Sequence, residues 1–508
     1  MKAFLLYQQT DFDLDRELPP NEPALMKDLE LGTLLDAMAG GDTFLFDVAK
    51  KVILSGLTYP AEVVYRQRVL SDCMEQPSVV KEIYDIAVAA VDGERKVWHS
   101  FVTYPDAVLS RSVDVLQLFA GLLKQLRRVA DQHAGEFRSD GFTAFFEMLT
   151  KELDDAYFRA VDDHLRQLRF GHGVLISARL GKRNTGADFV LRKARPTEWS
   201  WRRLIPTKER SAYTIVIPPR DEGGMRALSE LRGRGLNLVA NALAQSTDHV
   251  LSFFSMVRFE LGFYLGCLNL RRQLTAKAEP LCFPSPVAPG SPVLSCRGLY
   301  DLCLALVLRE RRVVGNDVNA DGRSLVLITG ANQGGKSTFL RSVGLAQLMM
   351  QCGMFVAAEE YRANFCDGLF THYKREEDPT MTSGKLDEEL SRMRDIADQL
   401  RPNSIVLFNE SFAATNEREG AEIARAIVRA LLEAGIKVFF VTHSFELADG
   451  FYRRRMGVAL FLRAERRPDG GRPFRLIVGE PLPTSYGQDL YERVFGEAPE
   501  VAPAILPA

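Results

Sequence analysis

The chain has 508 residues, 46% of them hydrophobic and 26% charged, and a formal net charge of −2. This length exceeds what one hydrophobic core supports and predicts roughly two to four domains. The near-neutral charge excludes a uniformly basic nucleic-acid-binding protein, so that role would need a local basic patch. The N-terminus turns acidic after a short apolar run, and no segment reaches about 20 uncharged apolar residues, so we expect neither a secretory signal nor a membrane span. The seven cysteines form no CxxC pair, which favours a reducing cytoplasm.

The first half of the chain is predicted to be mainly helical. From about residue 29 to about residue 170 apolar residues recur at helical spacing, as at Val113, Leu116 and Leu123. Residues 171–224 then shift to short β-branched or apolar runs between turn-rich segments, which predicts a small β insertion. Its expected strands are 174–176, 189–191 and 213–217.

One long helix is predicted next, from Met225 to about Leu274, because its apolar residues lie along one stripe. At about 1.5 Å per residue it would be long enough to act as a lever between distant domains. The proline-rich run from Glu279 to Pro292 is the predicted boundary. Residues 1–278 would then form a helical core and lever region, and residues 279–508 an α/β domain in which strands alternate with helices.

A glycine-rich loop follows a buried-strand run, Leu325 to Thr329, and precedes a helix-like stretch from Phe339 to about Cys352. The loop reads GxxxxGKS in the strand, loop, helix context that a P-loop requires; the alternative is a coincidental glycine-rich turn. Its backbone N–H groups would surround the phosphates of ATP at a helix N-terminus. Lys336 would reach the β and γ phosphates, and Ser337 would bind Mg²⁺. The predicted nucleotide-binding residues are Gly330, Ala331, Asn332, Gln333, Gly334, Gly335, Lys336, Ser337 and Thr338.

Two later strands are expected to bring catalytic residues to the same site. The strand Ser404–Phe408 ends in Asn409 and Glu410. Glu410 is the candidate general base, unless it only caps the next turn, and Asn409 offers Mg²⁺ an oxygen without a charge. The strand Lys437–Val441 leads to His443, where a γ-phosphate sensor would lie, although a lone histidine can also be structural. The predicted catalytic residues are Lys336, Glu410 and His443, and the predicted metal ligands are Ser337 and Asn409.

The stretch from Gly330 to Gly487 resembles the ATPase domain of the DNA mismatch-repair MutS family. Residues 328–338 look like that family's TGPNMGGKST, with Ala331 and Gln333 as the changes. Other segments are similar to the family's GxxVPA, DExxxGTSxxxG, THxxEL and SYG motifs: Gly353–Glu359, Asn409–Gly420, Thr442–Leu447 and Ser485–Gly487. The resemblance implies an ABC-type P-loop ATPase that uses ATP and Mg²⁺.

The resemblance also implies a homodimer or heterodimer through the ATPase domain, in which Thr415 and Asn416 complete the partner's active site. The segment Leu386–Leu390 would couple the nucleotide to the rest of the protein, or is simply the acidic first turn of a helix. The helical pattern starts almost at once, so we expect a member without the N-terminal mismatch-reading domain, and without an appended nuclease. Asn409 stands in place of the family's aspartate, which predicts slow or weakly Mg²⁺-dependent hydrolysis.

A basic cluster lies within the β insertion. Residues 179–210 contain ten Lys or Arg against three acidic residues, with Trp199 and Trp201 among them. Such a cluster can neutralise DNA phosphates without reading sequence, or it can be a solvated basic face. The candidate DNA contacts are Lys182, Arg183, Arg192, Lys193, Arg202 and Arg203.

The sequence therefore predicts an ATP-dependent DNA-binding protein of DNA repair or recombination, in which ATP hydrolysis drives dimer closure and clamping on duplex or branched DNA. Asn409 motivates an alternative, a nucleotide-gated scaffold with little ATP turnover that recruits a protein partner. A chromosome-maintenance or transporter ATPase of the wider ABC class is disfavoured, because no LSGGQ-like segment precedes the strand at 404–408.

Overall fold

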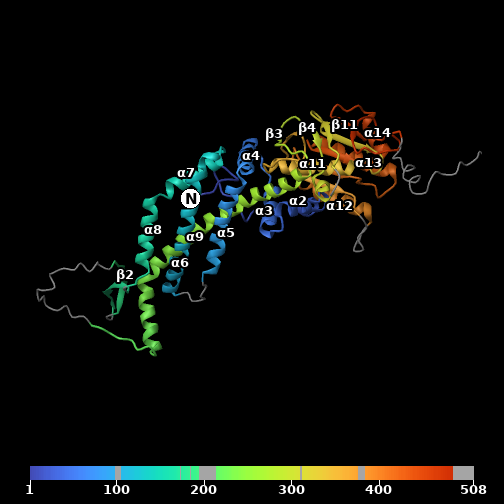
Figure 1. The fold of residues 1–508 in the computed structure, drawn as a ribbon. Helices are drawn as coiled ribbons and strands as arrows, with labels where there is room; N and C mark the ends of the chain where they lie inside the picture. The colour runs from blue at the N-terminus through green and yellow to red at the C-terminus, as the bar shows by residue number, and fades with distance from the viewer. Residues whose placement is uncertain are drawn as a thin grey trace, which may run out of the picture. The chain divides into compact units, whose positions relative to one another are not determined.

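The computed structural model divides into two compact units, whose elements are labelled in Figure 1. Unit 1 comprises Met1–Phe4 and Gln76–Leu261, and unit 2 comprises Leu5–Glu75 and Gly262–Ala508. The structure describes residues 1–97, 104–171, 173–182, 185–193, 213–308, 312–375, 384–468 and 470–483.

Unit 1 is built from helices, as the sequence predicts. Its core contains stacked or tilted phenylalanines from three of them: Phe119 lies 5.6 Å from Phe254, and Phe145 lies 6.5 Å from Phe253, between ring centroids. The long helix predicted from Met225 is confirmed as α9, which contributes its residues up to Leu261 to this unit. The helical elements are α5 (Pro77–Lys96), α6 (Pro105–His133), the short η1 (Ala134–Glu136), α7 (Asp140–Glu152), α8 (Asp155–Leu168) and α9 (Glu222–Ala276).

By length and composition α9 is apolar enough to cross a membrane, and no other described helix is. However, 61% of its apolar window is buried inside the protein. That burial is typical of a core helix, so α9 gives no argument for a membrane span.

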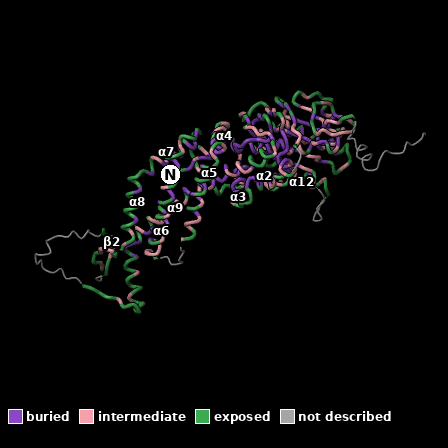
Figure 2. Tube along the Cα trace, viewed as in Figure 1, coloured by how far each residue is buried: buried purple, intermediate pink, exposed green. Residues whose placement is uncertain are grey.

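The predicted β insertion is an antiparallel hairpin of β1 (Leu175–Leu180) and β2 (Gly186–Arg192). The third expected strand, 213–217, is wrong: this segment forms no strand, and Tyr213 and Ile215 are 92% and 86% exposed. β-branched and aromatic composition favours a strand only where a partner strand accepts its hydrogen bonds and side chains. Figure 2 shows mostly exposed residues around β2.

Unit 2 holds two sheets. The six-stranded sheet has the order β12-β11-β6-β10-β9-β8 and is parallel except for the pair of β11 and β12. The four-stranded sheet has the order β3-β7-β4-β5 and is mixed. The strands are β3 (Ser285–Val287), β4 (Leu294–Leu299), β5 (Asn316–Asn319), β6 (Leu325–Gly330), β7 (Glu360–Asn364), β8 (Leu369–Tyr373), β9 (Ile405–Asn409), β10 (Lys437–Val441), β11 (Ala459–Ala464) and β12 (Leu476–Val478).

Helices cover both faces of the six-stranded sheet, which explains why its central strands are continuous apolar runs. On one face Leu327 and Phe440 belong to a buried cluster with residues of α13 and α14. On the other face Gly344 of α11 allows close packing, since a Cβ there would lie 2.9 Å from the Leu407 side chain of β9. The helices of unit 2 are α1 (Glu22–Asp28), α2 (Leu31–Ala39), α3 (Thr43–Leu54), α4 (Pro60–Glu75), α10 (Leu302–Val307), α11 (Lys336–Gln351), α12 (Lys385–Ala397), α13 (Glu417–Glu433), α14 (Phe445–Tyr452) and the end of α9.

This division differs from the predicted boundary at Glu279–Pro292. The N-terminal helices α1 to α4 belong to unit 2, where the fully buried Arg66 of α4 donates hydrogen bonds to the carbonyls of Leu6 (2.8 Å) and Cys352 (3.2 Å). A buried guanidinium needs such acceptors, so these segments are tied together. The proline-rich run contributes β3, where Pro286 is tolerated because β3 is an edge strand.

Candidate functional site

The phosphate loop connects the end of β6 to the start of α11. Gly330 and Gly335 have φ values of +108° and +87°, a backbone region that favours glycine. A Cβ on Gly330 would lie 2.8 Å from the backbone nitrogen of Ala464, and one on Gly334 would lie 2.6 Å from the Ala464 Cβ. The loop therefore needs its glycines to lie close to β11. The first N–H groups of α11, which have no acceptor within the helix, begin at this loop and fit a phosphate group.

Lys336 is folded back onto the phosphate loop. It is 5% exposed, and its Nζ donates hydrogen bonds to the carbonyls of Gly330 (3.1 Å) and Ala331 (2.9 Å). Burial lowers the pKa of Lys336 to about 8, although the Glu410 carboxylate opposes this shift. The ammonium group is thus still protonated at neutral pH, and loop carbonyls hold it where an anion would bind.

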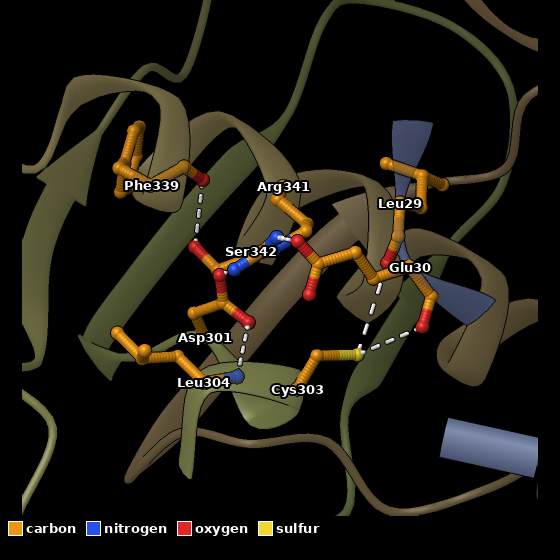
Figure 3. Close-up of polar contacts among 8 residues, drawn as sticks. All are labelled: Leu29, Glu30, Asp301, Cys303, Leu304, Phe339, Arg341 and Ser342. Atoms are coloured by element: carbon orange, nitrogen blue, oxygen red, sulfur yellow. Dashed lines mark hydrogen bonds and ion pairs between the residues drawn. The ribbon is translucent and has the colours of Figure 1, made fainter. Parts of the chain in front are cut away.

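The phosphate-loop helix is anchored one turn further on, as Figure 3 shows. Arg341 of α11 forms an ion pair with Asp301 (Nε to Oδ2, 2.5 Å) and a second one with Glu30. Asp301 also caps α10 by accepting the Leu304 N–H (3.0 Å), and the Cys303 thiol contacts the Glu30 carbonyl (3.4 Å). These contacts tie α11, and with it the phosphate loop, to Glu30 and Asp301, the residues that directly precede α2 and α10.

The two predicted metal ligands lie together. The Ser337 hydroxyl donates to the Asn409 Oδ1 at 2.9 Å. A hydroxyl and an amide oxygen are the hard ligands that Mg²⁺ accepts, so the residues fit this ion in type, but neither is charged. In the described part of the chain, no group of three or more His, Cys, Asp or Glu residues could hold a metal ion. The negative charge that balances a Mg²⁺ ion at this place would therefore have to come from phosphate oxygens.

Glu410 and His443 form a pair at the ends of β9 and β10. The Glu410 Oε1 lies 3.0 Å from the His443 Nε2. Glu410 has a left-handed backbone (φ +54°), and its N–H donates to the Val441 carbonyl at 2.9 Å, which fixes the turn that presents the carboxylate. The His443 hydrogen bond lowers the pKa of Glu410 against the effect of burial, and the charges of Lys336 and Lys374 contribute in the same direction.

His443 keeps one nitrogen unused. Its Nδ1 is buried and has no hydrogen-bond partner among the described residues. A buried polar nitrogen without a hydrogen-bond partner costs free energy. The cavity has a volume of about 320 Å³, and Glu410, His443 and Thr442 contribute to its lining.

The predicted trans-acting residues lie at the start of α13. Thr415 lines the same cavity, and its hydroxyl contacts the Glu419 carboxylate at 2.5 Å. Asn416 caps α13 by accepting the Glu419 N–H at 2.9 Å. Their local role is to begin this helix, and their contribution to a partner's site stays a prediction.

Two functional candidates were missed by sequence reasoning, His372 and Lys374 at the end of β8. His372 is fully buried; its Nε2 lies 2.9 Å from the Glu389 carbonyl, and its Nδ1 lies 2.8 Å from the Ser411 hydroxyl. The carbonyl can only accept, so Nε2 carries the proton. Burial lowers the pKa of His372 to about 4. The neutral ring thus joins α12 to the loop after Glu410, and no local sequence pattern marks it.

The predicted coupling segment Leu386–Leu390 lies in α12, with Asp387 and Glu388 in its first turn. The segment is thus the acidic first turn of a helix, and its role in coupling the nucleotide to the rest of the protein stays a prediction. The contact from Glu389 to His372 nevertheless brings the segment beside the catalytic strand ends.

Only part of the predicted DNA-binding cluster can be placed. Lys182, Arg192 and Lys193 are exposed on or beside the hairpin, and Arg192 Nε donates to the Ser177 hydroxyl at 2.9 Å. The rest of the cluster, with two tryptophans, and the SYG motif lie outside the described residues: Arg183, Arg202, Arg203, Trp199, Trp201 and Ser485–Gly487.

Two family models match the chain. The model of the MutS2 N-terminal domain matches residues 59–277, and that of MutS domain V matches residues 326–487, which include the phosphate loop, Glu410 and His443. The chain belongs to the MutS family. The first match shows that the relation to MutS proteins extends through most of the helical half, beyond the ATPase motifs.

The similar proteins include both MutS and MutS2 proteins. The chain is 34% identical over 259 residues to the DNA mismatch repair protein MutS of Chloroflexus aurantiacus, which is 48% of this chain and 26% of the relative. It is 34% identical over 186 residues to that of Thermus aquaticus, 36% of this chain and 22% of the relative. It is 38% identical over 216 residues to the endonuclease MutS2 of Lacticaseibacillus casei, 42% of this chain and 26% of the relative. The chain thus spans about a quarter of these relatives' length.

Proposed function

We propose that this MutS-family protein binds ATP at the phosphate loop and hydrolyses it. The observation that carries the proposal is the pair of Glu410 and His443 at 3.0 Å, at the same sheet edge as Lys336 and the pair of Ser337 and Asn409. A parallel sheet binds ligands at the carboxyl ends of its strands, especially where a phosphate loop leads into a helix. Membership of a family whose ATPase domain matches residues 326–487 supports the same reaction. We further infer an ABC-type architecture for this domain.

The residues have separate tasks in the hydrolysis. The loop N–H groups and Lys336 hold the phosphates, and Ser337 and Asn409 would hold Mg²⁺, which supplies positive charge to the phosphate oxygens. Glu410 accepts a proton from water as the water oxygen bonds to the γ-phosphorus and the bond to the β–γ bridging oxygen breaks, giving ADP and phosphate. His443 orients the Glu410 carboxylate through Nε2, which lies 3.0 Å from Oε1.

The DNA-related part of the proposal rests on the relatives and on the basic hairpin. The relatives are named DNA mismatch repair proteins and an endonuclease. We infer that Lys182, Arg192 and Lys193 contact the phosphates of duplex or branched DNA, and that ATP closes a dimer whose clamp holds that DNA. Thr415 and Asn416 would then reach the partner's nucleotide, in a homodimer or with a related chain.

A second candidate function is a nucleotide-gated scaffold with little ATP turnover. It is favoured by one observation, the uncharged Asn409 beside Ser337, because a neutral amide holds Mg²⁺ less firmly than a carboxylate does.

Phosphate release by the purified protein, with no DNA and with duplex, mismatched, single-stranded or branched DNA, separates the two functions. Lys336→Ala is the control without phosphate binding. Stimulation by one DNA form that is lost in the control supports the clamp and names its DNA class. Turnover at the control level with every DNA, while ATP still binds, supports the scaffold.

A further inference from the structure

Lys374 lies level with the candidate general base at the edge of the six-stranded sheet. Tyr373 of β8 pairs with Asn409 of β9 in parallel register, and the Lys374 N–H donates to the Asn409 carbonyl at 2.9 Å. The next residue on each strand is Lys374 on one and Glu410 on the other. The backbone therefore holds Lys374 beside the turn at Glu410, independently of the conformation of the lysine side chain.

The side chain of Lys374 lines the cavity that holds Glu410 and His443. Among the described residues that line this cavity, it is the sole lysine or arginine, against the carboxylates of Glu410 and Glu417. The described lining of this cavity thus carries one full positive charge, that of Lys374, and it includes no residue of the phosphate loop.

Lys374 also differs from its cationic neighbours, because in the described part of the chain it takes part in no ion pair. Arg375 pairs with Asp28 at 4.0 Å, and Arg392 pairs with Glu388 at 3.7 Å. Lys374 is exposed, yet its charge reaches Glu410, where it lowers the pKa of the carboxyl together with Lys336. Glu410 is therefore within the electrostatic reach of two ammonium groups, that of Lys336 and that of Lys374, which directly follows β8.

We propose that Lys374 contacts the γ-phosphate of bound ATP and stabilises the negative charge that develops on it during hydrolysis. The inference rests on the ATP hydrolysis proposed above. Asn409 brings no charge to hold Mg²⁺, so the γ-phosphate needs a further cation, and Lys374 is the one that the cavity offers. A positioned cation at the transferred phosphoryl group acts mainly on the transition state, because charge spreads over its oxygens there.

The test compares Lys374→Met, which removes the charge and keeps the length, with Lys374→Arg and with a matched control, Lys385→Met. Lys385 lines a second pocket, which it shares with Lys374 and Glu388, and it does not line the cavity of Glu410. Two quantities are measured: the Kd values of ADP and of a non-hydrolysable ATP analogue by calorimetry, and kcat for ATP.

We expect Lys374→Met to weaken binding of the analogue roughly tenfold and to lower kcat roughly a hundredfold, with the Kd of ADP unchanged. Lys374→Arg restores part of both, and Lys385→Met behaves like wild type. Unchanged analogue binding and kcat in Lys374→Met overturn the inference, and so does an equal loss of ADP and analogue binding, which would indicate a general structural defect.

Failure of the proposed function gives a different pattern. If wild type releases no more phosphate than Lys336→Ala, ATP hydrolysis is lost as a function, and the ratio of ADP to analogue affinity alone decides the role of Lys374. A ratio that rises only in Lys374→Met supports the contact with the γ-phosphate, and an unchanged ratio in that variant overturns it.

Discussion

The anchor of the phosphate-loop helix gives the sharpest stability prediction. Asp301 has a fully buried side chain, caps α10 through the Leu304 N–H, and pairs with Arg341, whose own side chain is 16% exposed. Asp301→Ala removes the cap, worth about 1 kcal/mol. It also leaves a buried guanidinium with one charged partner, where loss of a buried partner costs about 3–5 kcal/mol.

Glu30 reduces that cost, because it still pairs with Arg341 from a position that is 49% exposed. We therefore expect Asp301→Ala to lower the free energy of unfolding by about 3 kcal/mol. Asp301→Asn keeps an acceptor for the Leu304 N–H and should lose about 2 kcal/mol. Glu30→Gln, the control at the exposed side of the same arginine, should lose less than about 1 kcal/mol.

Urea denaturation followed by far-UV circular dichroism measures these differences as shifts of the midpoint at a constant slope. The double variant Asp301→Ala, Arg341→Met tests the cause, since it removes the unpaired charge and should be less unstable than Asp301→Ala alone. An Asp301→Ala protein as stable as Glu30→Gln would refute the anchor.

The remaining predictions concern pH, metal binding and DNA. Burial lowers the pKa of His372 to about 4, below its ordinary value of about 6.5, so the unfolded chain takes up the proton first as the pH falls. The free energy of unfolding should therefore fall by about 3 kcal/mol as the pH drops from about 6.5 to 4. His372→Gln should flatten this pH dependence, measured by urea titrations at several pH values. Asn409→Asp adds a carboxylate beside Ser337 and should lower the half-saturating Mg²⁺ concentration for phosphate release roughly tenfold, whereas an unchanged value would separate Asn409 from the metal. The triple variant Lys182→Ala, Arg192→Ala, Lys193→Ala should reduce the slope of log Kd for DNA against log salt concentration by about 2 to 3. The control Lys81→Ala removes a lysine that pairs with Asp85 on α5, and it should leave this slope unchanged.

The sequence predicts those parts of the fold that depend on local pattern. The strands β6, β9 and β10 are mostly buried, so each appears as a mainly apolar run that leads to a candidate functional residue at or shortly after its end. The phosphate loop is recognisable because its glycines are needed by its own backbone geometry.

The parts that could not be predicted depend on contacts between distant segments. β8 contains His372, whose buried ring nitrogens find their hydrogen-bond partners on Ser411 and Glu389, far along the chain. Lys374 gains its place from the register of β8 against β9, which periodicity does not give. The grouping of α1 to α4 with unit 2 depends on buried contacts such as that of Arg66 with Cys352, 286 residues apart.

The central claim, that Glu410 is the general base of an ATPase, is tested most directly by single-turnover hydrolysis of ATP by wild type and Glu410→Gln, with the Kd of ATP measured on both. The account predicts that Glu410→Gln binds ATP as tightly as wild type and hydrolyses it at least about a hundredfold more slowly. Equal hydrolysis rates in the two proteins, with ATP bound in both, would contradict it.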